Sequence, residues 1–525
     1  MGMGWRHIVE QPPRALAWVL LGLAAWIGLR HGIQLRGDGC EYILQTQAIA
    51  LRGTLRIEPD AARAYWNRTN PFGWMLEETR PPTRELSEQR QAGGGFGGLY
   101  PDRFGAYRYY HFWGYSLAIA PLYAALHWVW PAREYTAFAW MNLFFLALPF
   151  GLAWRAAPSW RLLVIGALAL LTPLPRYMGR PHSELFCFGL ALSSLLLAGQ
   201  LRTVWLSSLL LAVATAQNPP IVFFFPLHMA LALRQIRPCS IQQRLGALTA
   251  YLPAAAIILS SMAYFHHYFG SFNLIAQLGM AQFAYTSWSR VGSWLASPLV
   301  GAFWFYPLCF LLLPLALNRQ RIIFCLWALA GTFAAAWLAT TTNNFSSDQI
   351  GALRYSTWLL APLWWVLLST PSDSCRSRRF IIGTVISLAL LLFMRSHRPY
   401  SPAAVLYRLT HFADDPEVLA EHIMGREITY PAAFHGAYIW NLPGQESLWL
   451  VSRRWADMNP MLLKEITPQP AWRPHALLGE YLLLWRKAQP QEMECDNPVF
   501  IRNQQDELIY PRPHTSSGPG TRNKL

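Results

Sequence analysis

The chain is poor in charge and in cysteine for its length. Asp, Glu, Lys and Arg make up 14% of the 525 residues. The seven cysteines are scattered without CxxC or ligand spacing, so the sequence indicates neither a disulfide framework nor a zinc site. The glycine cluster Ala92 to Gly98 lacks the Lys-Ser/Thr ending of a nucleotide P-loop and follows no strand. We also find no internal repeats of the kind that build many transporters.

Apolar residues, in contrast, are abundant and come in blocks. Hydrophobic residues make up 53% of the chain, with 25 Trp, and the blocks have the length that spans a hydrocarbon core, roughly 17 to 25 residues. This pattern predicts an all-α polytopic membrane protein in a lipid bilayer. The formal charge is +15, but most basic residues lie in short connections between apolar blocks, as cytoplasmic loops require. We therefore expect no nucleic-acid partner.

About eleven transmembrane helices are expected. The first, Ala15 to Leu29, is interpreted as a retained signal anchor with its N-terminus inside, because no small-residue cleavage pattern follows it. The other expected spans lie near residues 134–154, 161–175, 183–200, 203–217, 219–234, 245–266, 295–316, 321–340, 354–369 and 380–394.

One apolar stretch, His111 to Trp130, is left out of this set. If it crossed the membrane, every later loop would change sides and the basic connections would face outward, against the cation bias. Its Gly114, Pro121 and many aromatic residues favour a helix in the membrane interface or a re-entrant hairpin. The alternative, a true span with a miscount elsewhere, stays open.

The expected topology divides the chain into three parts. Residues 1–394 form the transmembrane module, in which 33–133 is a large first outer loop. Residues 395–510 contain stretches such as ESLWLVSRRW and EYLLLWRKA and predict a small α+β outer domain, and 511–525 a disordered tail. The same topology brings Asp38 and Glu184 to the outer face, although two crossings separate them.

Five segments in this order resemble the GT-C superfamily of membrane glycosyltransferases, near the protein O-mannosyltransferase and aminoarabinose-transferase branch. The resemblance covers residues 13 to 394. The segments are RGDGCEYILQTQAIALRGTL, YHFWGYSLAIAPLYAAL, GRPHSELFCFGLAL, SWLASPLVGAFWFYPLCFLLLP and IGALRYSTWLLAPLWW.

The resemblance implies a GT-C-like fold with interfacial helices in the first outer loop, in a bacterial inner membrane, with the active site facing the periplasm. It also implies transfer of a sugar from a polyprenyl phosphate to a hydroxyl of a glycan, lipid or protein acceptor, usually with inversion. Such a reaction needs a base for the hydroxyl and cations for the departing phosphate.

Two carboxylates are the catalytic candidates. By the resemblance Asp38 corresponds to the first-loop general base, and Glu184 to a second outer carboxylate that orients the acceptor, shares a metal ion or raises the pKa of Asp38. Each has a structural alternative. Asp38 is also placed to cap a helix that starts near Glu41, and Glu184 to stabilise a helix N-terminus.

Arg354 is the candidate for the phosphate, because a lone Arg entering an apolar span needs an anionic partner and grips phosphate oxygens bidentately. Snorkelling to lipid headgroups is the alternative. The supplementary substrate-binding candidates are Arg108, His111, Glu41 and Tyr355. The chain departs from the family at Tyr110, His111 and Phe112, where members often have Lys-Pro or Pro-Pro.

A divalent metal cation is left open, with Asp38, His182 and Glu184 as its candidate ligands. Two other functions also stay open. One is a polymerase or ligase of lipid-linked oligosaccharides, and the other is a flippase or transporter of lipid-linked sugars, which would depend on polar residues in mid-membrane more than on Asp38.

Overall fold

The chain forms two compact units in the computed structural model. The first covers Met1–Pro82, Leu86–Phe345 and Ala352–His397, and the second covers Thr83–Glu85, Ser346–Gly351 and Arg398–Leu525. The structure describes, in the first unit, residues 22, 26, 33, 38–58, 99–154, 166, 172–236, 240–277, 281, 283, 286, 288–296, 301–313, 322–342, 354–369, 382–383 and 385–390. In the second unit it describes the strands that lie between 437 and 512.

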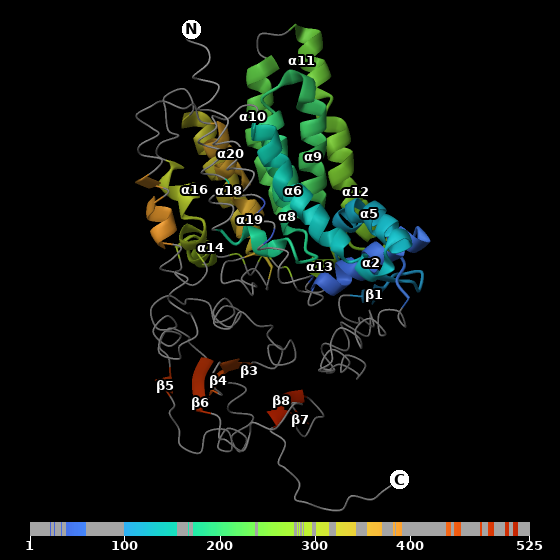
Figure 1. Cartoon of the computed structure of the whole chain (residues 1–525), viewed down its shortest axis with the longest axis vertical. Coiled ribbons are helices and arrows are strands. Elements are labelled where there is room, and N and C mark those ends of the chain that lie inside the picture. The colour runs from blue at the N-terminus through green and yellow to red at the C-terminus, as the bar shows by residue number, and fades with distance from the viewer. Residues whose placement is uncertain are drawn as a thin grey trace, which may run out of the picture. The chain divides into compact units, whose positions relative to one another are not determined.

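The described part of the first unit is mostly helical (Figure 1). Helices suit apolar stretches because every interior N–H and C=O is bonded within the same segment. The α-helices are α2 (Asp38–Arg52), α5 (Gly114–Val129), α6 (Thr136–Trp154), α8 (Glu184–Leu197), α9 (Val204–Gln217), α10 (Phe225–Ile236), α11 (Ile241–Leu248), α12 (Tyr251–Phe269), α13 (Leu274–Gln277), α14 (Trp288–Ala296), α15 (Ala302–Phe305), α16 (Pro307–Leu311), α18 (Ile322–Ala339), α19 (Ser356–Leu359) and α20 (Ala361–Ser369). The 3-10 turns are η2 (Pro131–Arg133), η3 (Leu174–Tyr177), η4 (Leu201–Thr203) and η5 (Pro219–Phe224).

Three of the described helices are long and apolar enough to cross a membrane. They are α6 over Thr136–Ala153, α11 joined to α12 over Ile241–Phe269, and α18 over Ile322–Ala339. The 19 residues of α6 rise about 28 Å, close to the hydrocarbon thickness of a bilayer. Shorter apolar helices cover Glu184–Leu197, Val204–Gln217 and Ser356–Ser369. The helical class expected from the sequence is confirmed, with three candidate spans among the described residues.

Some expected spans take another form. The stretch 295–316 does not form one helix, because Tyr306 leaves the helical conformation and Pro307, which has no N–H to donate, begins α16. The stretch 219–234 starts as the 3-10 turn η5 after a Pro-Pro pair and continues as α10. The expected spans 15–29 and 161–175 lie almost wholly outside the described residues.

Helix α5 occupies the stretch expected to lie in the membrane interface. It is one helix rather than a re-entrant hairpin, and Pro121 lies inside it. Its buried face, which includes Tyr123, packs on α2, whereas Leu117 and Trp128 are exposed on the outside. A helix that is apolar on both faces suits contact with protein on one side and lipid on the other.

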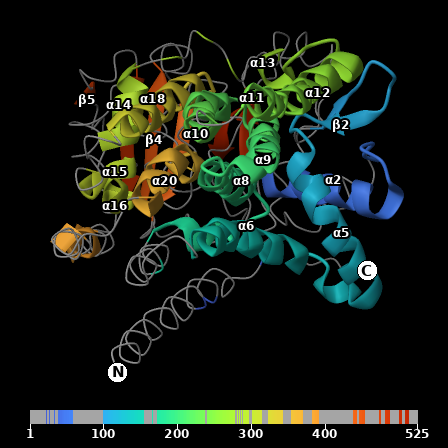
Figure 2. The same cartoon turned by 90° about the horizontal axis from the view of Figure 1, so that it is seen from above.

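Helix α8 lies among the other helices, between α6 and the pair α9 and α10 (Figure 2). Every residue from Glu184 to Leu195 is buried, as expected of a helix that is hydrophobic all round. Gly189 makes the close contact with α6 feasible, because a Cβ at this position would overlap the carbonyl oxygen of Phe145. Small residues allow such backbone approach between membrane helices.

A short hairpin precedes α5. Its strands are β1 (Leu99–Pro101) and β2 (Tyr107–Tyr109), which pair antiparallel. At its turn, Oδ2 of Asp102 lies 2.7 Å from Nε of Arg108, and both side chains are buried. The Arg108 guanidinium also lies 3.6 Å from the centroid of the Tyr268 ring. The hairpin is thereby attached to the end of α12.

Asp102 is ionised by these contacts. Burial by itself raises the pKa of its carboxyl. The hydrogen bonds from Arg108 and from the N–H groups of Ala106 and Phe104, together with the charge of Arg108, outweigh burial and hold the pKa below its ordinary value of 3.8. The carboxylate is therefore charged throughout the neutral range.

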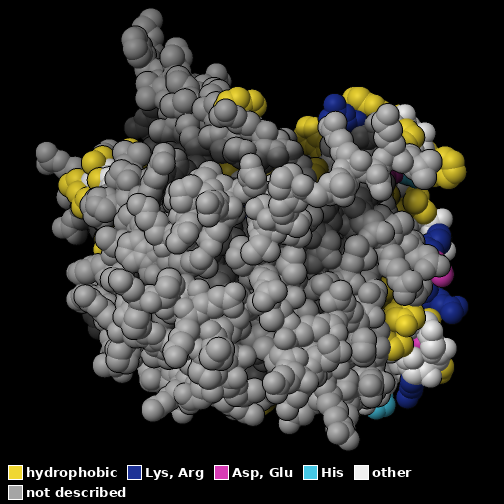
Figure 3. Space-filling view, turned by 90° about the horizontal axis from the view of Figure 1, so that it is seen from below, with side chains coloured by type: hydrophobic (Ala, Val, Ile, Leu, Met, Phe, Trp, Pro, Cys, Tyr) yellow, Lys and Arg dark blue, Asp and Glu magenta, His cyan; other side chains and the backbone are white. Residues whose placement is uncertain are grey.

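Most of the described side chains visible in Figure 3 lie along the right edge of the view, where apolar groups stand among Lys and Arg, and further apolar groups lie at the left edge and near the top. This mixture suits a membrane interface.

The second unit contains two antiparallel sheets over its described residues. Its strands are β3 (Ala437–Leu442), β4 (Glu446–Ser452), β5 (Arg473–Pro474), β6 (Tyr481–Lys487), β7 (Val499–Arg502) and β8 (Leu508–Arg512). The orders are β3-β4-β6-β5 and β7-β8. The two stretches singled out in the sequence form β4 and β6, which pair with each other. Strand β8 ends at Arg512, two residues inside the segment expected to be a tail.

Gly189→Ala is expected to lower the free energy of unfolding by about 1–3 kcal/mol, the usual cost of overpacking a close contact. Gly151→Ala is the matched control. Gly151 lies in α6, and a Cβ added there would meet nothing within 4 Å, so the change should be neutral or mildly stabilising through helix propensity. Thermal unfolding in detergent measures both. Unfolding of Gly189→Ala at the wild-type temperature would contradict the close α6–α8 contact.

Asp102→Asn is expected to cost about 3–5 kcal/mol, because it leaves the buried Arg108 guanidinium without its carboxylate. The effect depends on pH. Since the folded-state pKa of Asp102 lies below the unfolded value, the ionised pair stabilises the fold above pH 3.8 and this contribution is lost as the pH falls through the lower folded-state pKa.

Thermal unfolding from about pH 7 to about pH 3 should therefore show the difference between wild type and Asp102→Asn becoming smaller toward the acid end. Arg103→Gln, on an exposed position of the same hairpin, serves as the control and should unfold like the wild type. A constant difference between wild type and Asp102→Asn across this range would show that the ionised carboxylate is not the stabilising form.

Candidate functional site

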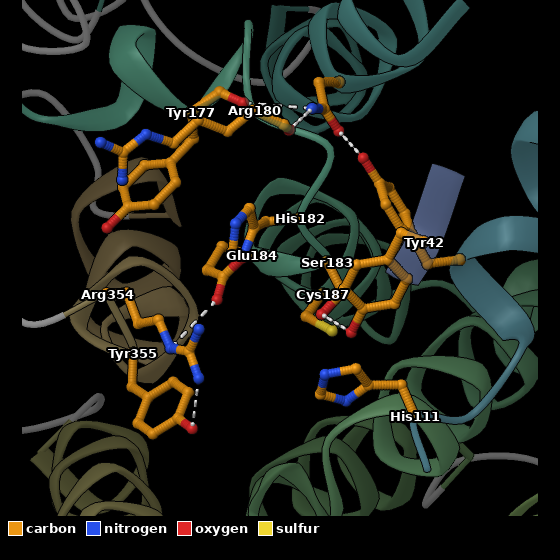
Figure 4. Close-up of polar contacts among 12 residues, drawn as sticks. Tyr42, His111, Tyr177, Arg180, His182, Ser183, Glu184, Cys187, Arg354 and Tyr355 are labelled. Carbon is orange, nitrogen blue, oxygen red and sulfur yellow. Dashed lines mark hydrogen bonds and ion pairs between the residues drawn. The ribbon is translucent and has the colours of Figure 1, made fainter. Parts of the chain in front are cut away.

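Polar side chains from five distant segments gather where α2, α5, α8, α9 and α19 begin or end (Figure 4). Tyr42 of α2 lies in the middle of this group. Its ring is stacked on His111 with 5.0 Å between centroids, and its hydroxyl lies 3.3 Å from Ser183 Oγ. Gln217, the last residue of α9, donates from Nε2 to the same hydroxyl at 3.3 Å. Tyr42 thus connects α2 with the starts of α5 and α8 and the end of α9.

Glu184 and Arg354 form a buried ion pair on one side of Tyr42. Oε1 of Glu184 lies 3.8 Å from Nε of Arg354, and Oε2 lies 3.7 Å from Nδ1 of His182. Arg354 also donates from Nη2 to the Tyr355 hydroxyl at 3.2 Å. The carboxylate and guanidinium side chains are 5% and 12% exposed, so each needs the other's charge. Both separations exceed hydrogen-bond length, so the contact is ionic.

The residues that follow Arg354 fix its position. Trp294 Nε1 donates to Ser356 Oγ at 3.0 Å, and the Tyr306 hydroxyl lies 3.3 Å from Thr357 Oγ1. All four of these side chains are buried. Helices α14 and α16 therefore hold the start of α19, and with it Arg354.

Glu41 and His111 form a second pair on the other side of Tyr42. Oε2 of Glu41 lies 3.2 Å from Nε2 of His111. Gln45, one turn further along α2, donates from Nε2 to the His111 carbonyl oxygen at 3.4 Å. The ring and the backbone of His111 are thus both held from α2.

Asn142 holds the turn that carries His182 and Glu184. Its Nδ2 donates to the carbonyl oxygens of Arg180, Tyr177 and Met178 at 2.6, 3.1 and 3.3 Å. Its Oδ1 accepts from the Tyr115 hydroxyl at 3.0 Å. Asn142 is fully buried in α6, so this amide satisfies backbone groups that water does not reach.

The same turn carries a further cation. The Arg180 guanidinium lies 5.8 Å from the centroid of the Tyr177 ring, at the end of the bundle where Glu184 begins α8. Sequence reasoning passed over Tyr42, Asn142, Gln217 and Arg180. A polar residue inside or at the end of an apolar span was the available signal for Asn142 and Gln217.

The candidates from the sequence separate into three groups. Glu184, His182, Arg354 and Tyr355 come together, and Glu41 with His111 lies beside them across Tyr42. Arg108 is engaged with Asp102 in the hairpin instead.

Asp38 begins α2, three residues earlier than expected, and its side chain lies outside the described residues. Among the residues that the structure describes, no group of three His, Cys, Asp or Glu side chains is arranged to hold a metal ion. The expected ligand set of Asp38, His182 and Glu184 therefore stays a prediction, because one of its members is outside that part.

Comparison with known proteins gives no relative. No model of a protein family, no curated protein and no solved structure matches the chain.

Asn142→Asp is expected to destabilise the protein by about 1–3 kcal/mol or more, because a carboxylate of the same size has no N–H for three buried carbonyl oxygens. Tyr115→Phe removes a single donor and should cost only about 1 kcal/mol. Thermal unfolding in detergent compares them. Similar unfolding temperatures for the two variants would show that the amide of Asn142 does not hold the turn.

Proposed function

We propose that this protein is a membrane glycosyltransferase of the GT-C kind. In this proposal it moves a sugar from a polyprenyl-phosphate donor to a hydroxyl of a glycan, lipid or protein acceptor at the periplasmic face of a bacterial inner membrane. About eleven crossings and an outer second unit belong to the proposal, and the three described candidate spans support its membrane part.

The main support is that the five segments of the resemblance converge. Glu41, His111, Glu184 and Arg354 come from four of them, and all contribute to the group around Tyr42. The fifth supplies Trp294 and Tyr306, which hold the residues after Arg354. Segments that are separated by up to about three hundred residues have no local reason to meet, so a shared site accounts for their common chemistry.

The position of the ionisable groups favours an enzyme over a transporter. Glu41 is in the first turn of α2, His111 precedes α5, Glu184 begins α8 and Arg354 precedes α19. Transporters more often carry such residues on broken helices near the bilayer midplane. Groups at the ends of helices are instead placed to meet a headgroup phosphate and a water-soluble acceptor.

The charges suit departure of a phosphate. The negative charge of Glu184 compensates the positive charge of the Arg354 guanidinium across 3.8 Å. A donor phosphate would approach the planar fork of Arg354, which stabilises the negative charge that develops as the sugar leaves. Glu184 then acts as the positioning residue that keeps Arg354 at the start of α19. The group that accepts the proton of the acceptor hydroxyl lies instead on or beside α2, which carries Asp38 and Glu41.

Arg354→Lys is expected to lower turnover markedly, because a point-like ammonium does not reproduce a two-pronged grip on phosphate, and Arg354→Ala should be worse. The loss should fall on kcat more than on acceptor KM if the charge develops in the transition state. The assay follows release of polyprenyl phosphate from synthetic short-chain donors bearing pentoses or hexoses. The protein is in nanodiscs, and a membrane extract of the producing cells supplies the acceptor.

Arg234 provides the matched control. Its guanidinium lies 5.3 Å from the centroid of the Phe324 ring, as that of Arg354 lies 5.0 Å from Tyr355, but it is in the last turn of α10 and does not belong to the group around Tyr42. Arg234→Ala should transfer at the wild-type rate. Equal rates for the Arg, Lys and Ala forms at 354 would reduce Arg354 to a helix anchor, and donor movement across the membrane without chemistry would favour a flippase.

A further inference from the structure

Glu41 and His111 form a close ion pair in which the carboxylate faces one ring nitrogen, without the alignment of a hydrogen bond. Glu41 Oε2 lies 3.2 Å from Nε2, and the two side chains are 8% and 16% exposed. A carboxylate this close to Nε2 stabilises the imidazolium that forms when the other ring nitrogen, Nδ1, accepts a proton. Carboxylates beside a histidine serve this purpose in general-base catalysis.

The His111 ring is held on its faces as well. Tyr42 stacks on it at 5.0 Å with an interplanar angle of 15°, and Tyr110 lies at 4.2 Å with an angle of 32°. The described titratable groups against the ring are thus Glu41 and Tyr42 of α2 and the neighbouring Tyr110. A loose interfacial histidine would not need this support, and a side chain fixed in this way is pre-organised for chemistry.

The pair and Arg354 belong to one chain of contacts. The Tyr42 ring stacks on His111 and lies 6.4 Å from His182, which is ion-paired to Glu184 and through it to Arg354. Figure 4 shows Arg354 at the lower left and His111 at the lower right, with the residues that link them above. Inversion at the anomeric carbon requires a base and a leaving-group cation on opposite sides of that carbon.

We infer that His111, positioned by Glu41, is the catalytic residue that accepts the proton of the acceptor hydroxyl. The inference rests on the proposed glycosyl transfer. In the step, the hydroxyl O–H bond breaks and its proton moves to His111 Nδ1. The oxygen forms the bond to the anomeric carbon, and the bond from that carbon to the phosphate oxygen breaks with its electron pair on the phosphate. The imidazolium returns its proton to water before the next turnover.

The inference competes with the assignment of the base to Asp38, and the two differ in pH dependence. A histidine base gives a rate that rises through the near-neutral range, where imidazoles lose their proton. A carboxylate base gives a rate that no longer changes in that range, because the rising part of its pH–rate profile, its limb, lies near pH 4. Glu41→Gln should move a histidine limb to lower pH, since the lost carboxylate no longer favours the imidazolium.

The experiment measures kcat/KM from about pH 5 to about pH 9 with synthetic short-chain polyprenyl-phosphate sugars and the same membrane extract, for protein in nanodiscs. His111→Gln and His111→Ala should lose about two to four orders of magnitude and the near-neutral limb. Added imidazole should restore part of the activity of His111→Ala, in proportion to its neutral fraction. A purely structural role for the ring predicts no such rescue.

The chain contains a matched control. His127 and Glu134 also pair a histidine with a glutamate, through a hydrogen bond of 2.5 Å between Nδ1 and Oε2 where α5 ends. His127→Gln and Glu134→Gln should leave the rate and its pH profile unchanged. Asp38→Asn is measured in the same series. The pH at which the rate rises should shift less in Glu41→Asp, which keeps a carboxylate, than in Glu41→Gln.

Three results would overturn the inference. They are near-wild-type transfer by His111→Gln, a wild-type profile that is level across the neutral range with a large loss in Asp38→Asn, and failure of imidazole to restore His111→Ala when that variant unfolds at the wild-type temperature. If His111→Ala is unstable, the Glu41→Gln limb shift decides alone. A wild-type protein that releases no polyprenyl phosphate at any pH contradicts the proposed function itself, which is a separate outcome.

Discussion

A carboxylate and a guanidinium stay charged inside a group of apolar helices only when they face each other, and Glu184 and Arg354 do so at 3.8 Å. This pair joins the first residue of α8 to a residue two positions before α19, from segments that are 170 positions apart in the numbering. Helix α8 also contacts α6, α9, α10 and α20, so the ion pair lies at one end of a packed helical group. The remaining polar contacts are arranged around it.

Neutral polar groups complete this end without adding charge. Asn142 satisfies three carbonyl oxygens of the turn before Glu184, and Gln217 donates to Tyr42 while its Oε1 accepts from the Tyr115 N–H at 3.0 Å. The two side-chain amides make the hydrogen bonds that water would otherwise make to these buried backbone and hydroxyl groups. The turn that carries the acidic residue is consequently as well fixed as a helix, which a site for chemistry requires.

The two buried arginine–carboxylate pairs differ in their geometry. The Asp102–Arg108 pair fastens the hairpin and is far more strongly bonded, at 2.7 Å, than the Glu184–Arg354 pair. The first pair is a short charge-assisted hydrogen bond, whereas the second is held at ionic distance without one. Arg108, a supplementary substrate-binding candidate in the sequence, is thus engaged within the hairpin, whereas Arg354 faces Glu184.

The sequence by itself predicted a mostly helical chain with helices long and apolar enough to cross a membrane, and it singled out Glu184 and Arg354 as charged residues beside apolar stretches, because apolar blocks of bilayer length and lone charges next to them are local properties of a chain. It could not determine that Arg108 pairs with Asp102, that residues 295–316 break at Pro307, or that Asn142 holds a turn. Those depend on which segments meet, and contacts between residues far apart in the chain leave no local pattern. Only the tertiary structure brought Glu41 against His111 and both to Tyr42, since side-chain partners across helices are chosen by packing rather than by spacing.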